Sequence, residues 1–205
     1  MPQLITRQLI EQAITFESYM DLTCSIVANP TPQGLYQNPK THRYTRSNLE
    51  RMNKVLQNVV LEPKLYNLLS TLTENWTWLV LSEPWCGDAS WGTPTLYLIA
   101  SCSNLIDFRI LLRDEHPDVM KAYKTLDSDS IPKLICLRTK DLKELGTWGP
   151  RPKLLQEMVM RWKNEPNIDY RESVRQLHDW YDKDMSREIQ HEMIALIKDW
   201  KGVLK

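Results

Sequence analysis

The chain has 205 residues, enough for one hydrophobic core with additions but short for two independent domains. Its 26 basic and 26 acidic side chains cancel and the pI is near 6.9, so the chain lacks the electrostatic footprint of a protein that binds nucleic acid or an anionic membrane. No stretch approaches the roughly 18 apolar residues of a membrane helix, and residues 1–30 lack the ordered regions of a signal peptide. We therefore expect a cytoplasmic protein.

The four cysteines are widely spaced and include no C-x-x-C pair; they are Cys24, Cys86, Cys102 and Cys136. In a reducing compartment they should be free thiols. The four histidines are equally scattered, so we expect neither a metal site nor a cofactor. Cys102 and Cys136 fall in apolar stretches and are expected to pack in the core.

The N-terminal part has the periodicity of amphipathic helices, which we predict over residues 4–14, 16–28 and 62–72. Prolines and a glycine between residues 30 and 39 predict a loop. Ser47 and Glu50 have the spacing of a capping box, which predicts that a helix begins there and runs to about Asn58.

The middle of the chain alternates between apolar strand patterns and helical patterns. We predict strands over residues 76–82, 107–113 and 131–137 with a hairpin partner within 139–148, and helices over 89–102, 116–124 and 152–163. Such alternation implies parallel strands joined by right-handed crossovers, and the terminal hairpin adds an antiparallel edge. The expected fold is α/β, with a mixed central sheet flanked by helices.

Residues 170–200 carry apolar side chains at steps of three and four. This pattern predicts one long amphipathic helix, or two helices broken near residues 182–186, packed against the body of the protein.

Several residues in the middle of the chain resemble the thioredoxin superfamily. Trp85, Cys86 and Gly87 are similar to its W-C-G signature, and Pro94 matches the proline in the helix that follows the active site. Ile131 and Pro132 open a strand, as the family's cis-proline does, and Gly146 falls where the family's edge strand carries a glycine. The resemblance implies a thioredoxin-like fold in which the cis-proline faces Cys86.

Longer segments, including SEPWCGDAS, SIPKLICL and GTWGPRP, together resemble one small bacterial branch of thioredoxin-like proteins with a W-C-G-D-A motif and helical extensions at both ends. On this resemblance we expect a helical N-terminal extension over residues 1–61, a thioredoxin-like domain over 62–165, and a C-terminal helical extension over 166–205 that packs on the core.

The chain departs from the family's pattern at the residues that run its dithiol chemistry. Ala89 replaces the second, resolving cysteine, and Val80 stands where the family has a buried aspartate. Asp88 replaces the proline between the two cysteines, and Lys133 follows Pro132 where the family has threonine. Asp88 and Lys133 are therefore candidate modulators of Cys86, although Asp88 has an ordinary explanation as a helix N-cap and Lys133 as a solvent-facing side chain.

The reactivity of Cys86 depends on whether its pKa is below or above its free value of about 8.5. A helix N-terminus favours the thiolate by roughly 0.3–1 kcal/mol, and up to about 2 kcal/mol in a partly buried site. A carboxylate at Asp88 opposes the thiolate by roughly 3 kcal/mol at about 6 Å and an effective dielectric constant of about 20. The sequence leaves the direction of the shift open.

Two functions remain open. In the first, the protein is a monothiol oxidoreductase whose nucleophile Cys86 forms mixed disulfides with protein or low-molecular-weight thiol and disulfide substrates. The substrate would be held by Trp85, Gly87, Ile131 and Pro132, and the mixed disulfide would be resolved by an external thiol or by Cys24. In the second, the protein is a non-catalytic peptide- or protein-binding module in which Trp85, Pro132 and Trp148 form a groove. Neither function needs a nucleic acid or a membrane, and the sequence does not fix an oligomeric state.

Overall fold

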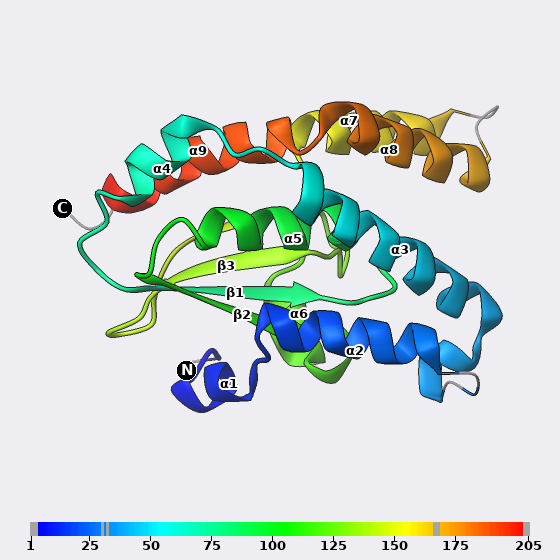
Figure 1. Cartoon of the computed structure of the whole chain (residues 1–205), viewed down its shortest axis with the longest axis horizontal. Helices are drawn as coiled ribbons and strands as arrows, with labels where there is room; N and C mark the ends of the chain where they lie inside the picture. The colour runs from blue at the N-terminus through cyan, green and yellow to red at the C-terminus, as the bar shows by residue number, and fades with distance from the viewer. Residues whose placement is uncertain (1–3, 30, 32, 166–168, 203–205) are drawn as a thin grey trace.

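A four-stranded mixed sheet forms the centre of the protein (Figure 1), and its strands have the order β2-β1-β3-β4. The computed structural model describes residues 4–29, 31, 33–165 and 169–202. The strands are β1 (Trp76–Ser82), β2 (Ile106–Leu112), β3 (Lys133–Arg138) and β4 (Lys143–Trp148). Each lies within two residues of its predicted position.

Strands β1 and β2 are parallel, as strand–helix alternation predicts, with Trp76 opposite Ile106 and Ser82 opposite Leu112. The expectation of parallel strands is wrong for β3, which is antiparallel to β1, and β4 pairs with β3 as the predicted hairpin. The connection between β2 and β3 therefore brings β3 into the sheet in the direction opposite to β1. The alternation of strand and helix patterns in the sequence does not by itself specify this direction. The result is the mixed sheet that was expected, with helices added at both ends of the chain.

Strand β1 is buried along its whole length. Trp76, Trp78 and Val80 point into the larger hydrophobic cluster, whereas Leu79 and Leu81 point into a second cluster on the other face of the sheet. This split follows the two-residue alternation of side chains in a strand. A strand buried on both faces requires the nearly continuous apolar sequence WTWLVLS.

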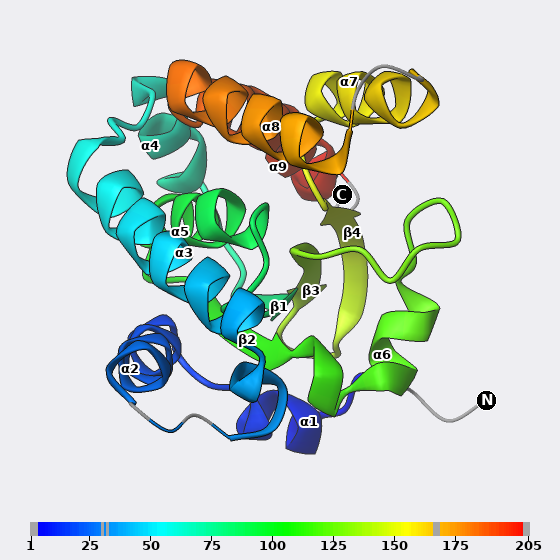
Figure 2. The same ribbon diagram turned by 90° about the vertical axis from the view of Figure 1, so that its right-hand side faces the viewer.

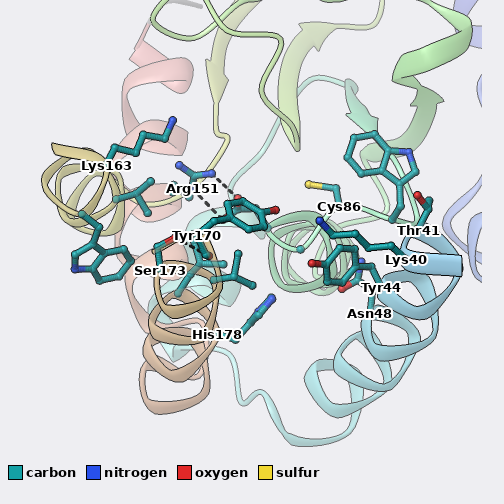
Figure 3. A pocket seen from close by; sticks show the side chains of 17 residues that line it. Lys40, Thr41, Tyr44, Asn48, Cys86, Arg151, Lys163, Tyr170, Ser173 and His178 are labelled. Atoms are coloured by element: carbon teal, nitrogen blue, oxygen red, sulfur yellow. Dashed lines mark hydrogen bonds and ion pairs between the residues drawn. The ribbon is translucent and has the colours of Figure 1, made fainter. Parts of the chain in front are cut away.

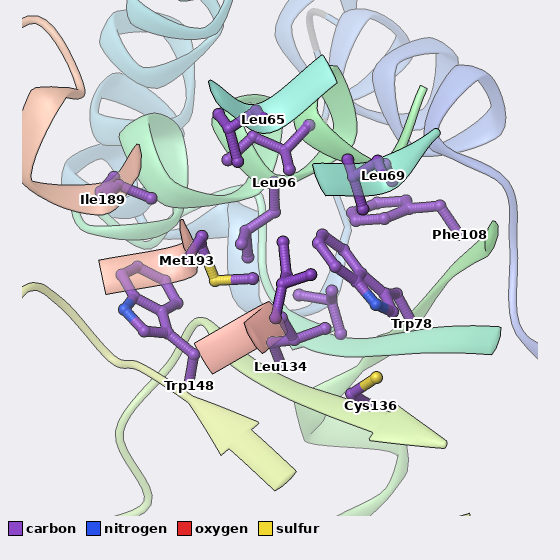
Figure 4. Packing of buried hydrophobic residues seen from close by; sticks show 14 of the residues in the cluster. Leu65, Leu69, Trp78, Leu96, Phe108, Leu134, Cys136, Trp148, Ile189 and Met193 are labelled. Atoms are coloured by element: carbon purple, nitrogen blue, oxygen red, sulfur yellow. The ribbon is translucent and has the colours of Figure 1, made fainter. Parts of the chain in front are cut away.

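The helices that cover the face of the larger cluster include α4 (Pro63–Leu69), α5 (Ala89–Ala100) and α9 (Arg187–Gly202). Leu65 and Leu69 of α4, Leu96 of α5 and Met193 of α9 meet the sheet there (Figure 4). Trp200 of α9 packs edge-on against two tryptophans of β1, with ring centroids 6.2 and 6.1 Å away. The C-terminal helix is therefore part of the core.

The second cluster lies between the other face of the sheet and the short helices α1 (Arg7–Gln12) and α6 (Pro117–Ala122). Ile14 and Ile110 exchange two backbone hydrogen bonds of 2.9 and 2.8 Å, which attach the N-terminal segment to the outer edge of β2. Short 3₁₀ turns, η1 (Gly34–Gln37) and η2 (Arg113–Glu115), complete the connections.

Helix α3 (Pro39–Asn58) lies between α5 and α2 (Phe16–Ala28) (Figure 2). It begins eight residues before the predicted capping box, because Asn38 caps it by accepting a hydrogen bond from Lys40 N at 2.9 Å and Pro39 occupies its first position. Ser47 lies inside the helix, so the capping-box prediction is wrong.

The C-terminal segment forms two helices, which confirms the second of the two predicted alternatives. Helix α8 (Tyr170–Asp184) ends at Met185 and Ser186, whose φ angles of 49° and 64° are left-handed, and α9 follows. Helix α7 (Lys153–Asn164) lies beside α8. The break lets α9 cover the sheet while α8 runs on with α7 beyond it (Figure 1). Among the described residues, no helix combines the length and the apolar character needed to span a membrane.

Candidate functional site

The loop between β1 and α5 carries Cys86 at the start of α5. Cys86 N donates a hydrogen bond to Glu83 O at 3.0 Å, and Ser90 N donates to Cys86 O at 3.2 Å, so the loop turns tightly into the helix. The thiol of Cys86 donates to Ile131 O at 3.3 Å, and the Ile131–Pro132 peptide bond is cis. Two segments 45 residues apart in sequence therefore meet at the sulfur.

A pocket of about 500 Å³ opens over this loop (Figure 3). Helix α3 forms one wall and helices α7 and α8 form the other. The lining residues on α3 are Lys40, Thr41, Tyr44 and Asn48; those on the loops are Trp85, Cys86, Gly87, Asp88 and Arg151; and those on α7 and α8 are Val159, Trp162, Lys163, Tyr170, Ser173, Val174, Leu177 and His178. The pocket is thus built largely from helices outside the strand–helix–strand core.

Side-chain contacts hold the walls in place. The buried Asn48 of α3 donates from Nδ2 to Pro84 O at 3.0 Å, which ties α3 to the Cys86 loop. Lys54 of α3 forms an ion pair with Asp182 of α8. The two walls are therefore connected to the loop and to each other without a ligand.

Asp88 has a different role from the expected N-cap. Its side chain makes no capping hydrogen bond to α5. Arg151 donates instead from Nε to Oδ1 at 3.0 Å and from Nη2 to Oδ2 at 2.5 Å, and the buried Tyr181 hydroxyl donates to Oδ1 at 2.9 Å. The carboxylate thus joins the Cys86 loop to the segment before α7 and to α8.

Arg151 was not identified from the sequence. It follows Gly149, whose φ of 110° suits glycine and whose Cβ, if it had one, would overlap Pro132 O. This close approach brings Arg151 beside Asp88, and Arg151 Nη1 also donates to Gln156 Oε1 at 2.9 Å. The segment GTWGPRP contained the signal, because a glycine between an edge strand and an arginine indicates a close backbone approach.

His178 and Tyr181 of α8 also belong to the site and were not identified from the sequence. Trp91 Nε1 donates to His178 Nδ1 at 3.3 Å, so Nδ1 is the acceptor and Nε2 carries the proton of the neutral ring. Burial lowers the pKa of His178 to about 4, with the nearby Arg51 adding to the effect, so the ring is neutral at pH 7. A side chain at Gly87 would come within 3.1 Å of this ring, so Gly87 lets α8 approach the loop.

The surroundings of Cys86 raise its pKa to about 12. Burial is the largest cause, and the Asp88 carboxylate adds to it. Hydrogen bonds from the amides of Ala89 and Asp88 and the charge of Arg151 act in the opposite direction but are weaker. Val80, in place of the family's buried acid, is fully buried among apolar side chains. The sulfur is therefore a protonated thiol at neutral pH.

The structure places the remaining predicted site residues in different environments. Trp85 lines the pocket, with the Arg113 guanidinium 4.7 Å from its ring centroid. Ile131 and Pro132 are buried and are not part of the pocket lining. Lys133 is 8% exposed and donates to Thr125 Oγ1 at 3.0 Å, so the expectation that it faces solvent is wrong. Burial lowers its pKa.

The prediction that Trp85, Pro132 and Trp148 form a groove is wrong, because Pro132 and Trp148 are both buried. Trp148 Nε1 donates to Glu192 Oε2 of α9 at 2.7 Å, and its ring packs in the large cluster. Helix α9 therefore covers the position at which the open groove was expected.

The other cysteines lie apart from the pocket lining. Cys24 is exposed on α2, Cys102 is half-buried against the large cluster, and Cys136 is buried within it, so the prediction of core packing for the last two is confirmed. Within the described ranges, no three His, Cys, Asp or Glu side chains are grouped as a metal site would require.

The fold and the placement of Cys86 between β1 and α5 define a thioredoxin-like protein. The Thioredoxin family model matches residues 34–165, well over half of the chain, and the chain belongs to this family. The match includes α3, so the family region takes in one wall of the pocket.

Two solved structures have the same fold. One is a protein of unknown function from Pseudomonas aeruginosa, which is 16% identical with a TM-score of 0.59; the alignment covers 92% of this chain and 94% of that one. The other is an HIV epitope-scaffold, which is 16% identical with a TM-score of 0.57, over 93% of this chain and 96% of that one. No curated protein matches the sequence.

Proposed function

We propose that this protein is a non-catalytic binding module that holds an organic ligand in the pocket over Cys86. The observation that carries the proposal is the pocket itself, about 500 Å³ between α3 and the pair α7 and α8. Its size falls in the range of small-molecule sites, and it combines apolar walls with a few polar groups. The ion pair between Lys54 and Asp182 supports a pocket that is formed before the ligand arrives.

The chemistry at Cys86 supports binding over electron transfer. Thiol–disulfide exchange requires a thiolate, and the raised pKa of Cys86 keeps the sulfur protonated at neutral pH. Asp88, which raises that pKa, is held in place by Arg151 and Tyr181. The position of the resolving cysteine is occupied by Ala89.

A titration with N-phenyl-1-naphthylamine tests the proposal, because this neutral apolar dye fluoresces when it leaves water. We expect saturable binding to the wild type. Val174→Trp places a large ring in the pocket and should weaken binding at least about tenfold. Arg171→Trp is the matched control, since Arg171 is exposed on the same helix outside the pocket lining, and should bind as the wild type does. Equal dye affinity in the wild type and in Val174→Trp would overturn the proposal.

Monothiol exchange is the second candidate, favoured by the position of Cys86 in the pocket lining, where its side chain extends toward the pocket (Figure 3). In this reaction the Cys86 thiolate attacks a disulfide, forms a mixed disulfide and releases one thiolate, and an external thiol later reduces the mixed disulfide. Intact-mass measurement of a Cys24→Ser variant after incubation with oxidised glutathione at pH 7 tests it. An adduct that disappears in the Cys24→Ser/Cys86→Ser variant would support exchange, and our proposal predicts no such adduct.

We also propose that the chain belongs to a bacterial, cytoplasmic branch of the family with the W-C-G-D-A motif. In this organisation residues 1–61 and 166–205 are extensions of a domain over residues 62–165. The near full-length likeness to the Pseudomonas aeruginosa protein supports the arrangement of helices at both ends.

A further inference from the structure

The ionisable side chains that line the pocket leave it with a positive charge. Asp88 and Arg151 neutralise each other through their two-point ion pair. Lys40 and Lys163 are the other charged lining residues at pH 7, and neither forms an ion pair within the described part of the chain. An occupant that carries a negative charge would balance them.

Lys40 is the better placed of the two lysines. Its ammonium lies 5.8 Å from the ring centroid of Tyr44 on α3 and 5.3 Å from that of Tyr170 on α8. Figure 3 shows its side chain extending from α3 across the pocket toward Tyr170. Attraction between the ammonium and the two rings therefore holds the charge of Lys40 between the two walls. Because this side chain is already ordered, the binding of a ligand does not have to reduce its conformational entropy again.

The rest of the lining suits an apolar body. Five lining side chains have large apolar surfaces: Trp85, Val159, Trp162, Val174 and Leu177. The neutral His178 adds a hydrogen-bond donor, because its Nδ1 accepts from Trp91 and its proton is on Nε2. Charge, donor and apolar surface are thus present in one cavity.

We propose that the ligand is an organic anion with an apolar body, and that its negative group pairs with Lys40. This inference rests on the proposed binding function and names the ligand class. The apolar body lies against the walls contributed by α7 and α8, and the anionic group is held at the α3 wall. No covalent step at Cys86 is involved.

Two dyes with the same skeleton test the charge preference. N-phenyl-1-naphthylamine is neutral, and 1-anilinonaphthalene-8-sulfonate adds one sulfonate to the same rings. We expect Lys40→Met to lower the ratio of sulfonate affinity to neutral-dye affinity about three- to fivefold, the range of a partly exposed ion pair. Lys40→Arg should keep the preference, and the preference should fall as salt is raised.

Lys64→Met is the matched control, because Lys64 is exposed on α4 and lies outside the pocket lining. A fall in this ratio only in Lys40→Met supports the inference. Two outcomes would overturn the inference while the neutral dye still binds and the binding function stands. In the first, the ratio of the two affinities is the same in the wild type and Lys40→Met. In the second, the ratio falls equally in Lys40→Met and Lys64→Met. If neither dye binds the wild type saturably, the binding function itself fails.

Discussion

Asp88 and Arg151 form a two-point ion pair between side chains that are only 10% and 15% exposed. The contact joins the Cys86 loop to the segment before α7, and Tyr181 adds a third hydrogen bond from α8. The pocket floor and the C-terminal wall therefore depend on one carboxylate.

Asp88→Ala should strongly destabilise the protein, because it leaves a buried guanidinium without its counter-charge. Removing one partner of a buried ion pair costs about 3–5 kcal/mol. Urea unfolding measures the change. Asp118→Ala is the control, since Asp118 and its partner Lys121 are 85% and 69% exposed, and the loss there should be below about 1 kcal/mol. Similar losses in the two variants would contradict the assigned role of Asp88.

Glu83 should make stability depend on pH. It is a buried residue of the loop that carries Cys86, and burial raises its pKa from 4.5 to about 7. The folded protein therefore holds this proton more tightly than the unfolded chain, so the stabilisation is complete below pH 4.5 and is lost as the pH rises through about 7. The loss is about 3 kcal/mol over this range.

Glu83→Gln isolates this effect, because an amide can still accept the hydrogen bond from Asp114 N and does not titrate. The free energy of unfolding of the wild type, relative to that of Glu83→Gln, should fall between pH 4.5 and 8. Urea titrations across this range measure the difference. A difference that stays constant with pH would show that Glu83 titrates normally.

Gly146→Ala should destabilise the contact between β4 and α9, because a Cβ at this position would overlap the Trp200 indole. Trp200 is 3% exposed and is held by tryptophans of β1, so it has little room to move. Overpacking of this kind costs about 1–3 kcal/mol. Gly202→Ala, with nothing within 4 Å of the added methyl group, is the control and should not destabilise. Thermal unfolding of both variants measures the effect. A lower melting temperature in Gly146→Ala alone would show that the contact with Trp200 is responsible, whereas equal changes in the two variants would contradict this explanation.

The sheet could be predicted from the sequence because its signals are local. The apolar run of β1 and the hairpin turn before β4 each specify structure within a few residues. The antiparallel pairing of β1 with β3 could not be read in this way, since it depends on how the intervening chain packs.

The candidate site was only partly predictable. The motif identifies Cys86, but the partners of Asp88 lie 63 and 93 positions away, and the glycine before Arg151 indicates a close backbone approach without naming Asp88 as the partner. In the sequence, the position of Asp88 at the start of a helix is consistent with an N-cap as well as with an ion pair. Only the fold, which places Arg151 beside Asp88, distinguishes the two roles. Lys133 does not face solvent because β3, like β1, is buried on both faces at this position.

The rate of alkylation of Cys86 as a function of pH tests most directly whether the site is a binding pocket and not a redox centre. Iodoacetamide labelling of Cys86, followed by peptide mass spectrometry in a Cys24→Ser background, gives the rate at each pH. We predict slow labelling at pH 7 and a rate that still rises above pH 10, because burial and Asp88 hold the pKa of Cys86 near 12. Asp88→Asn should shift the rise to lower pH. A rate that levels off below pH 8.5 would mean that Cys86 is a thiolate under physiological conditions and would contradict the account.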